Sequence, residues 1–531
     1  MHTLESKMAD RLTRSLQVGA LLAVLAGIAP AANQTDTVTP VIVGGELPYA
    51  VELRQYDMGA ASMPSLHSFA AGEHNGQWVV VAGMTNGLHG FDIDQSSIPE
   101  RKQNRSVWVI DPVSKQSWSR TIDPSDAGSG LTEEQVLSLT PANSQFEQLG
   151  DRLYMTGGYG DNDPLDDTSR STFSTLSAFD LPGLVDWAKG GAGTAADHIR
   201  QVDDPLFKVT GGDMYAIDGQ VHLVFGQDYE GRYRGSLNGE YTKQVRTFTI
   251  QDDGSTLGFT HVGSTTPEDH FRRRDLNVYP TLEKQGDGSL EQGLTVLSGV
   301  FTESRGAWSV PVEIDASGNP EQIDNGLDPL NTGGVLDASD QVFKQAMNNY
   351  HSAKLGLFSE ATGDMHELLF GGITLQEYLP GDAAADADGF VTDNALPNTN
   401  QITSVIRNAD GSYEQHYLGE YPELMADDGN RMRFGSNAEF FADHAVMTYE
   451  NGVIPMDLLH SLADDQGQVR LGYIFGGLIT NAKHVFGNPV GLSSASGEVF
   501  EVILTLSVPE PSGLALLGLL LAPLAQRRNR N

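Results

Sequence analysis

Short apolar runs that end in glycine recur along the chain. The fullest copy is Leu368-Leu369-Phe370-Gly371-Gly372. Five others have the same form: Val79 to Gly83, Leu153 to Gly158, Leu223 to Gly226, Val296 to Gly299, and Tyr473 to Gly477. Their first glycines, at 83, 157, 226, 299, 371 and 476, are 74, 69, 73, 72 and 105 residues apart. Similarity at a near-constant period is typical of repeat proteins, so the pattern predicts six units, the last with an insertion.

The positions around each run predict a four-stranded antiparallel unit. In the first unit a strand starts at His67, Asn75-Gly76 is a hairpin turn, and Trp78 to Ala82 is the second strand. Strands at 107–110 and 117–122 complete the unit. The third strand recurs after each glycine, at 174–179, 245–250, 307–314, 402–406 and 499–504. Glycine makes up 59 of 531 residues, which fits a turn-rich β protein.

The last unit lacks a fourth strand, because the chain passes from Leu506 straight into a different kind of segment. The early stretch Glu52 to Gly59 resembles the fourth strands at Leu257 to Gly263 and Tyr413 to Gly419, with an aromatic residue or His, an aliphatic residue and then Gly. We expect it to supply the missing outer strand. That pairing would close a ring and remove exposed sheet edges, which otherwise invite aggregation.

With their apolar strand ending in Gly-Gly and their later aromatic strand, as at Trp108 and Trp118, the repeats resemble the kelch family of β-propellers. The resemblance covers about 51–506. It implies an all-β fold: a six-bladed kelch-like propeller of four-stranded antiparallel blades over 49–506, closed by an N-terminal strand. Kelch repeats run near about fifty residues, so the surplus here falls in loops, and the first, third and fourth units lack the second glycine. Seven blades, with an irregular one inside 417–465, is the alternative.

Composition limits the classes of function. The chain has 33 Lys and Arg against 70 Asp and Glu, and its formal net charge is −37. Such a surface repels nucleic acids and anionic membranes. There is no cysteine, which excludes disulfides, thiolate nucleophiles and Cys-ligated metals.

The first 31 residues have the layout of a secretory signal peptide. Lys7, Arg11 and Arg14 precede an apolar run at 18–28, and Ala29-Pro30-Ala31 offers a small-residue cleavage site. The apolar run is short for a membrane span, so a permanent anchor is the less favoured alternative. The sequence therefore predicts export.

The last residues, 507–531, carry a second targeting pattern. Pro509-Glu510-Pro511 is followed by an apolar run at 513–525 and by the arginines at 527, 528 and 530. This resembles the PEP-CTERM sorting tail of exported bacterial proteins. The resemblance implies a Gram-negative host, transient insertion of the short hydrophobic helix into the inner membrane, and processing by an exosortase that recognises Pro509, Glu510 and Pro511. Release to the cell surface or the exopolysaccharide matrix would follow. An ordinary C-terminal membrane tail is the alternative.

In propellers of this type the first strand of each blade lines the central channel, and ligands usually bind at a channel mouth. The starts of the predicted first strands are unusually polar. They give the candidate ligand-binding residues His67, Asn143, Asp213, Arg274, Asp275, Asn349, His351 and Asn437, together with Ser144 and Glu439. Mixed donors and acceptors on one axis suit a sugar or a carboxylate. A water-filled channel without a specific ligand is the alternative.

Two further features were weighed. The cluster Arg272-Arg273-Arg274 would suit an acidic polysaccharide, because Arg binds carboxylates bidentately, or it would pair locally with Glu268 and Asp269. Two acidic loops would suit calcium, which prefers several oxygen ligands. Their candidate metal ligands are Asp161 and Asp163 in one loop, with Asp166 and Asp167 nearby, and Asp386 and Asp388 in the other. Solvated acidic loops are the alternative.

Catalytic signatures are weak. The chain has no G-x-S-x-G and no H-E-x-x-H, and galactose-oxidase-like copper chemistry needs a Cys that is absent. A lyase using Tyr350 and His351 is the remaining enzymatic hypothesis. The leading prediction is an exported, non-enzymatic binding protein that presents loops and a polar channel mouth to a glycan or protein. The alternatives are an extracellular lyase or hydrolase acting on polysaccharide, and a purely structural matrix component.

Overall fold

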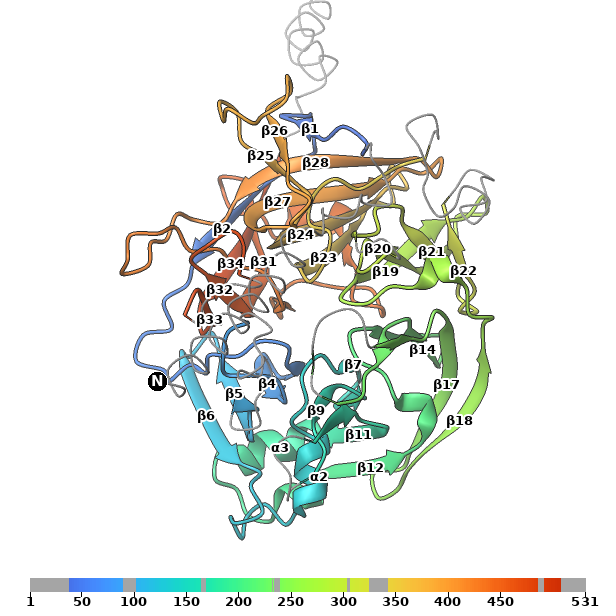
Figure 1. Ribbon diagram of the computed structural model, residues 1–531, viewed down its shortest axis with the longest axis vertical. Helices are drawn as coiled ribbons and strands as arrows, with labels where there is room; N and C mark the ends of the chain where they lie inside the picture. Colours follow the sequence, from blue (N-terminus) through green and yellow to red (C-terminus); the bar gives the residue numbers. More distant parts are fainter. Residues whose placement is uncertain are drawn as a thin grey trace, which may run out of the picture.

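The computed structural model describes residues 38–88, 102–163, 169–231, 233, 239–302, 306–323, 342–485 and 491–507. The fold is all-β, with sheets arranged around a central axis as in a β-propeller (Figure 1). The predicted signal peptide and the Pro-Glu-Pro tail lie outside the described residues. The described helices are short: α2 (Glu133–Ser138), α3 (Leu181–Ala188), and the 3-10 helices η2 (Ala195–His198), η3 (Pro205–Phe207), η4 (Asp269–Phe271) and η5 (Met456–Ser461).

Five sheets have four strands each, in order from the axis outward or the reverse. The first contains β3 (Ala70–His74), β4 (Gln77–Val81), β5 (Ser106–Asp111) and β6 (Gln116–Thr121). The second contains β7 (Gln145–Leu149), β8 (Arg152–Thr156), β11 (Thr175–Asp180) and β12 (Ile199–Asp203). The third contains β13 (Asp213–Ile217), β14 (Gln220–Val224), β17 (Val245–Asp252) and β18 (Leu257–Ser264). The fourth contains β19 (Asn277–Lys284), β20 (Leu290–Leu297), β21 (Val312–Ile314) and β22 (Pro320–Gln322). The last contains β29 (Ala438–Ala442), β31 (Gln468–Gly476), β34 (Val499–Leu506) and β2 (Tyr49–Gln55).

A larger sheet lies between the fourth and the last. Its central strands are β23 (Ala353–Phe358), β24 (Met365–Ile373), β27 (Asn398–Arg407) and β28 (Tyr413–Glu420). Two short parallel strands, β1 (Ile42–Val43) and β30 (Ile454–Pro455), extend its edges. The prediction of six four-stranded sheets is therefore wrong in this detail: five have four strands, and this one has six. The extra strands come from segments distant in sequence, which no local pattern indicates.

Small two-stranded ribbons extend beyond the ends of several inner strands. They are β9 (Tyr159–Asp161) with β10 (Arg170–Thr172), β15 (Gln227–Asp228) with β16 (Glu240–Tyr241), β25 (Gln376–Tyr378) with β26 (Phe390–Thr392), and β32 (Leu478–Thr480) with β33 (Ser493–Ala495).

The N-terminal strand completes the last sheet. β2 pairs antiparallel with β34, from Tyr49 opposite Leu506 to Gln55 opposite Phe500. Tyr49 and Leu53 are both buried. The prediction that this early segment supplies the missing outer strand is confirmed, although the strand covers 49–55 rather than 52–59.

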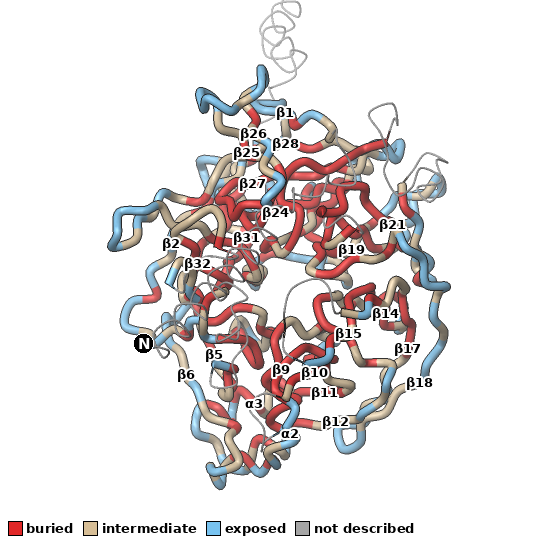
Figure 2. Tube along the Cα trace, in the orientation of Figure 1, coloured by how far each residue is buried: buried red, intermediate tan, exposed pale blue. Residues whose placement is uncertain are grey.

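The core consists of apolar clusters between neighbouring sheets rather than one central core. Val79 of the first sheet packs in the same cluster as Leu153 of the second, and Val224 of the third packs in the same cluster as Val278 of the fourth. Between the last sheet and the first, the ring of Trp78 stacks on Phe441 with 4.5 Å between ring centroids. Figure 2 shows the buried residues concentrated along the strands. The alternating apolar strands thus bury both faces, as expected where each sheet packs against two others.

Glycine residues link each sheet to the next. After the second strand of every sheet, a glycine N–H donates to a carbonyl just before the following first strand. The pairs are Gly83 to Pro141 (3.1 Å), Gly158 to Val209 (2.8 Å), Gly226 to Arg273 (3.0 Å), Gly299 to Asn349 (2.9 Å), Gly372 to Phe434 (3.1 Å), and Gly477 to Leu66 (2.8 Å). The last link joins the last sheet to the first. The retained glycine is the second of each pair, so the three units with one glycine lack the first, and Ala82, Phe225 and Ser298 stand there with positive φ.

Gly477→Ala is expected to lower the free energy of unfolding by about 2 kcal/mol. Gly477 has φ +82, and an added Cβ would lie 2.6 Å from the carbonyl oxygen of Ser436. Gly150→Ala is the matched control, because Gly150 has φ +60 but open space around an added Cβ, so it should cost only about 1 kcal/mol. Urea unfolding measures both. Equal losses would contradict a packing role for Gly477.

Candidate functional site

A cavity of about 370 Å³ lies on the axis where the first strands of the sheets meet. Its lining comes from β7, β13, β19, β23 and β29, and from the residues just before β3. The volume lies in the range of small-ligand sites, roughly 300–1,000 Å³. Aromatic side chains, among them Phe146, Tyr215 and Phe440, contribute apolar surface beside the polar groups. The sequence concentrates polar residues in these inner strands, and the fold brings them to one place.

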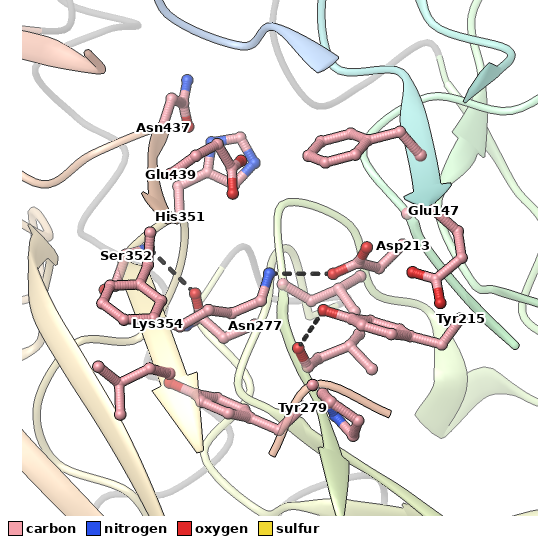
Figure 3. A pocket seen from close by; sticks show the side chains of 18 of the residues that line it. Glu147, Asp213, Tyr215, Asn277, Tyr279, His351, Ser352, Lys354, Asn437 and Glu439 are labelled. Carbon is pink, nitrogen blue, oxygen red and sulfur yellow. Dashed lines mark hydrogen bonds and ion pairs between the residues drawn. The ribbon is translucent and has the colours of Figure 1, made fainter. Parts of the chain in front are cut away.

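Four ionisable side chains from four different sheets line this cavity: Glu147 on β7, Asp213 on β13, Lys354 on β23 and Glu439 on β29 (Figure 3). The Lys354 Nζ lies 3.0 Å from Asp213 Oδ2. Glu147 Oε1 accepts the backbone N–H of Ala216 at 3.4 Å. Lys354 and Asp213 are mostly buried, with 21% and 17% of their side chains exposed.

Burial shifts the protonation of these groups. It raises the pKa of Glu147 to about 8, with Asp213 adding to the shift. Burial also raises the pKa of Glu439 to about 7, although Lys354 opposes the change. Burial alone would lower the pKa of Lys354, but the carboxylates of Asp213 and Glu439 outweigh it and the pKa is raised. At neutral pH the cavity therefore offers carboxylic acid donors, carboxylate acceptors and an ammonium group.

A rim of backbone surrounds one end of the cavity. Each first strand is preceded by one residue with positive φ: Ser68, Asn143, Gly211, Asp275, His351 and Asn437. The N–H of Asn143 donates to Ser68 O, Gly211 to Asn143 O, Asp275 to Gly211 O and Asn437 to His351 O, at 3.3, 3.1, 2.7 and 2.9 Å. Gly, Asn and Asp tolerate this conformation best, which gives a local reason for the polar strand starts seen in the sequence.

Side chains of the rim also contact one another. His351 Nε2 lies 3.1 Å from Asp275 Oδ1. Asn437 Nδ2 donates to Ser68 Oγ at 2.9 Å. The rim therefore presents an imidazole oriented by a carboxylate and an amide oriented by a hydroxyl.

Of the eight predicted ligand-binding residues, Asn143, Asp213, His351 and Asn437 line the cavity. Asp275 does not line it, but it contacts His351. The other three were misplaced: His67, Arg274 and Asn349 are at most 3% exposed and do not line it. They precede a rim residue by one or two positions, and neighbouring side chains of an extended chain point in opposite directions.

Glu147, Lys354 and Tyr215 line the cavity although the sequence interpretation did not single them out. They lie inside the first strands, whereas the prediction considered mainly the strand starts. A charged residue within an inner strand was the available signal: the corresponding strand β3 begins Ala70-Ala71, while β23 begins Ala353-Lys354. Glu439, noted at the start of its strand, does line the cavity.

The three consecutive arginines pack between sheets instead of forming an open anion site. Arg272 lies over Tyr241 and Arg273 over Trp308, at 4.0 and 4.8 Å from the ring centroids. Arg274 donates to the Tyr233 hydroxyl at 2.8 Å. Arg273 is fully buried, and burial lowers its pKa to about 9. Neither docking of an acidic polysaccharide nor pairing with Glu268 and Asp269 describes their contacts.

The two predicted calcium loops use their acids differently. Asp161 is buried and forms an ion pair with Arg170 at 3.0 Å, while Asp163 is exposed. Asp386 Oδ1 accepts the N–H groups of Asp388 and Phe390 at 3.0 and 2.9 Å, which stabilises its own turn. Asp166 and Asp167 lie outside the described residues. Across the described ranges no three His, Asp or Glu side chains are grouped to hold a metal ion.

Comparisons with known proteins add little to this geometry. No protein-family model and no curated protein matches the chain. Among solved structures, the chain is similar to one described as "Structure of YjhT", at 11% identity and a TM-score of 0.39, over 84% of this chain and 100% of that one. A likeness at this level carries no functional information. Within the described residues, none of the helices has the length and hydropathy that a bilayer-spanning segment requires.

The raised pKa of Glu147 predicts a pH-dependent stability. The folded-state pKa of about 8 lies above the ordinary value of 4.5, so the stability that this group contributes is present below pH 4.5 and is lost as pH rises through 8. Glu147→Gln has no charge to bury. Its melting temperature should therefore exceed that of the wild type by several degrees at pH 9 and by little at pH 5. Thermal melts across this range test it, with the exposed Glu291→Gln as control; a constant difference would contradict the assignment.

Proposed function

We propose that this protein is an exported binding protein whose axial cavity holds a sugar-sized unit of a glycan. The observation that carries the proposal is the convergence of Glu147, Asp213, Lys354 and Glu439, from four sheets, on one cavity of about 370 Å³. Hydroxyl-rich ligands need donors and acceptors in several directions, and this lining supplies both. A purely structural matrix component would have no need for ionisable groups gathered on the axis, where burying them costs stability.

The proposal includes the architecture and the address. The six sheets act as six blades of a kelch-like propeller, with the six-stranded sheet as an extended blade, which the six equivalent glycine links support. The signal peptide at 1–31 and the Pro509-Glu510-Pro511 tail direct export and exosortase processing to the cell surface or matrix. Replacing the tail with residues that lack the Pro-Glu-Pro triplet should retain the protein at the inner membrane.

A glycan array probed with purified residues 34–507 tests the binding function. Wild type should bind a defined set of glycans, and Asp213→Asn should weaken that binding at least tenfold. Glu291→Gln, an exposed substitution on the outer part of β20, serves as the matched control and should bind as wild type does. Binding that survives Asp213→Asn unchanged would place the ligand elsewhere, and a silent array would contradict the proposal.

A second candidate function, an enzyme acting on the same glycan, is favoured by the His351 and Asp275 pair. Its carboxylate orients the imidazole at 3.1 Å, and Glu147 is protonated at neutral pH because burial raises its pKa to about 8. A base and an acid on one cavity suit lyase or hydrolase chemistry. Tyr350 does not belong to this set, since its side chain is buried and does not line the cavity. New reducing ends or unsaturated products, lost in His351→Ala, would establish turnover.

A further inference from the structure

The cavity contains more carboxyl groups than cations. Lys354 is engaged by Asp213, with 3.0 Å between Nζ and Oδ2. Within the described part of the chain, neither Glu147 nor Glu439 forms an ion pair. Both nevertheless face the same enclosed space, as Figure 3 shows. Two carboxyl groups in a mostly buried site without a cation are unfavourable unless something else supplies the positive charge.

We propose that the ligand of the axial cavity is a sugar bearing a free amino group, whose ammonium lies among the carboxyl groups of Glu147, Asp213 and Glu439. This rests on the proposed glycan-binding function and names the class of sugar. The neutral amides and hydroxyls of the rim, at Asn143, Asn437 and Ser68, then bind the sugar hydroxyls. The ammonium supplies the charge that the cavity lacks, in charge-assisted hydrogen bonds to the carboxylates.

Three other occupants fit less well. A bare metal ion needs several oxygen ligands at short distance, and no such group of three occurs in the described residues. An acidic sugar would need a free cation, but the one lysine of the described lining is already paired with Asp213, and Arg274 is buried away from the cavity. A neutral or N-acetylated sugar would fill the space but leave both glutamates without a positive partner.

The inference agrees with the protonation of the empty cavity. Without a cation, burial raises the pKa of Glu439 to about 7 and that of Glu147 to about 8. An ammonium beside them would favour their ionised forms, so binding should release protons near pH 7. The other charged groups that face this space or its rim are Asp213, Lys354, His351 and Asp275. Their opposite charges are already paired with one another.

Isothermal titration calorimetry tests the inference with a short glucosamine oligomer, the matching N-acetylglucosamine oligomer and the matching glucose oligomer. Residues 34–507 should bind the glucosamine oligomer at least tenfold more tightly than the other two. Repeating the titration near pH 7 in buffers of different ionisation enthalpy should reveal proton release. Glu439→Gln and Glu147→Gln keep the shape of the side chain and should each reduce the preference for the amino sugar at least tenfold, whereas Glu291→Gln should not.

The outcomes separate the two proposals. If the neutral or N-acetylated oligomers bind as tightly as the amino sugar, the inference is wrong and the glycan-binding function stands. If the amino sugar binds but Glu439→Gln and Glu147→Gln leave its preference unchanged, the ammonium lies elsewhere and the inference is again wrong. If no oligomer binds and the glycan array is also silent, both proposals fall.

Discussion

A chain that begins at residue 60 is expected to aggregate or to melt at least about 10 °C below a chain that begins at residue 34. The shorter chain lacks β2, so the outer edge of β34 loses a partner that pairs with it over seven residues, Tyr49 to Gln55. It also loses the buried side chains of Tyr49 and Leu53. Two such side chains and their ladder contribute on the order of 5 kcal/mol, which is comparable to the whole stability of many domains.

A chain that begins at residue 45 is the matched control. It lacks β1 and the hydrogen bond from Thr39 N to Lys344 O, but it keeps all of β2. It should stay monomeric and lose only a few degrees, because β1 adds two residues to an edge that β28 already forms with β27. Size-exclusion chromatography and thermal melts measure both truncations. A soluble chain from residue 60 with an unchanged melt would show that β2 does not hold the ring together.

Lys354→Met is expected to lower the free energy of unfolding by about 3 kcal/mol at pH 8, the lower end of the range for breaking a buried ion pair. The substitution leaves Asp213 without its partner at 3.0 Å and removes the cation that stabilises ionised Glu439. Urea unfolding provides the measurement. The loss should shrink at pH 5, where Glu439 is protonated and fewer negative charges remain in the cavity.

The double variant Lys354→Met with Asp213→Asn separates charge from packing. Removing both partners leaves no unpaired charge from the pair, so the double variant should recover at least half of the loss. A double variant as unstable as the single one would assign the effect to lost packing of the lysine stem. In that case the ion pair would contribute little.

The order of the sheets was predictable from sequence because its signals are local. A strand that ends in glycine, as at Phe370-Gly371-Gly372, marks the second strand of a sheet wherever it occurs. The closing strand was also predictable, since Tyr49 to Gln55 alternates in the manner of the other outer strands. The added strands β1 and β30 were not, because two residues carry no periodicity and their pairing is set by packing.

The second sheet shows a different limit. Its fourth strand, β12, was missed because helix α3 separates it from β11, whereas other sheets use a short turn at this point. Asp180 caps α3, Pro182 stands in its first turn, and Trp187 is buried under the sheet. These are recognisable helix signals, but the sequence interpretation, expecting a meander, did not weigh them.

The candidate site was predictable only in part. The polar residues that start the first strands serve mainly to adopt positive φ on the rim, as Asn143 and Asn437 do. Their side chains face the axis as a consequence. The charges deeper in the cavity, Glu147 and Lys354, lie within strands of ordinary appearance, and only the convergence of several sheets gives them a common environment. No spacing in the sequence reports such a convergence.

The pairing of β2 with β34 also determines when this protein finishes folding. Ser507 donates to the Leu47 carbonyl across 460 residues of chain, so the first strand made by the ribosome waits for nearly the last. At roughly 5–20 residues per second, that wait lasts roughly half a minute to a minute and a half. During synthesis the sheets can form one after another, yet the final seam can be sealed only after translation ends.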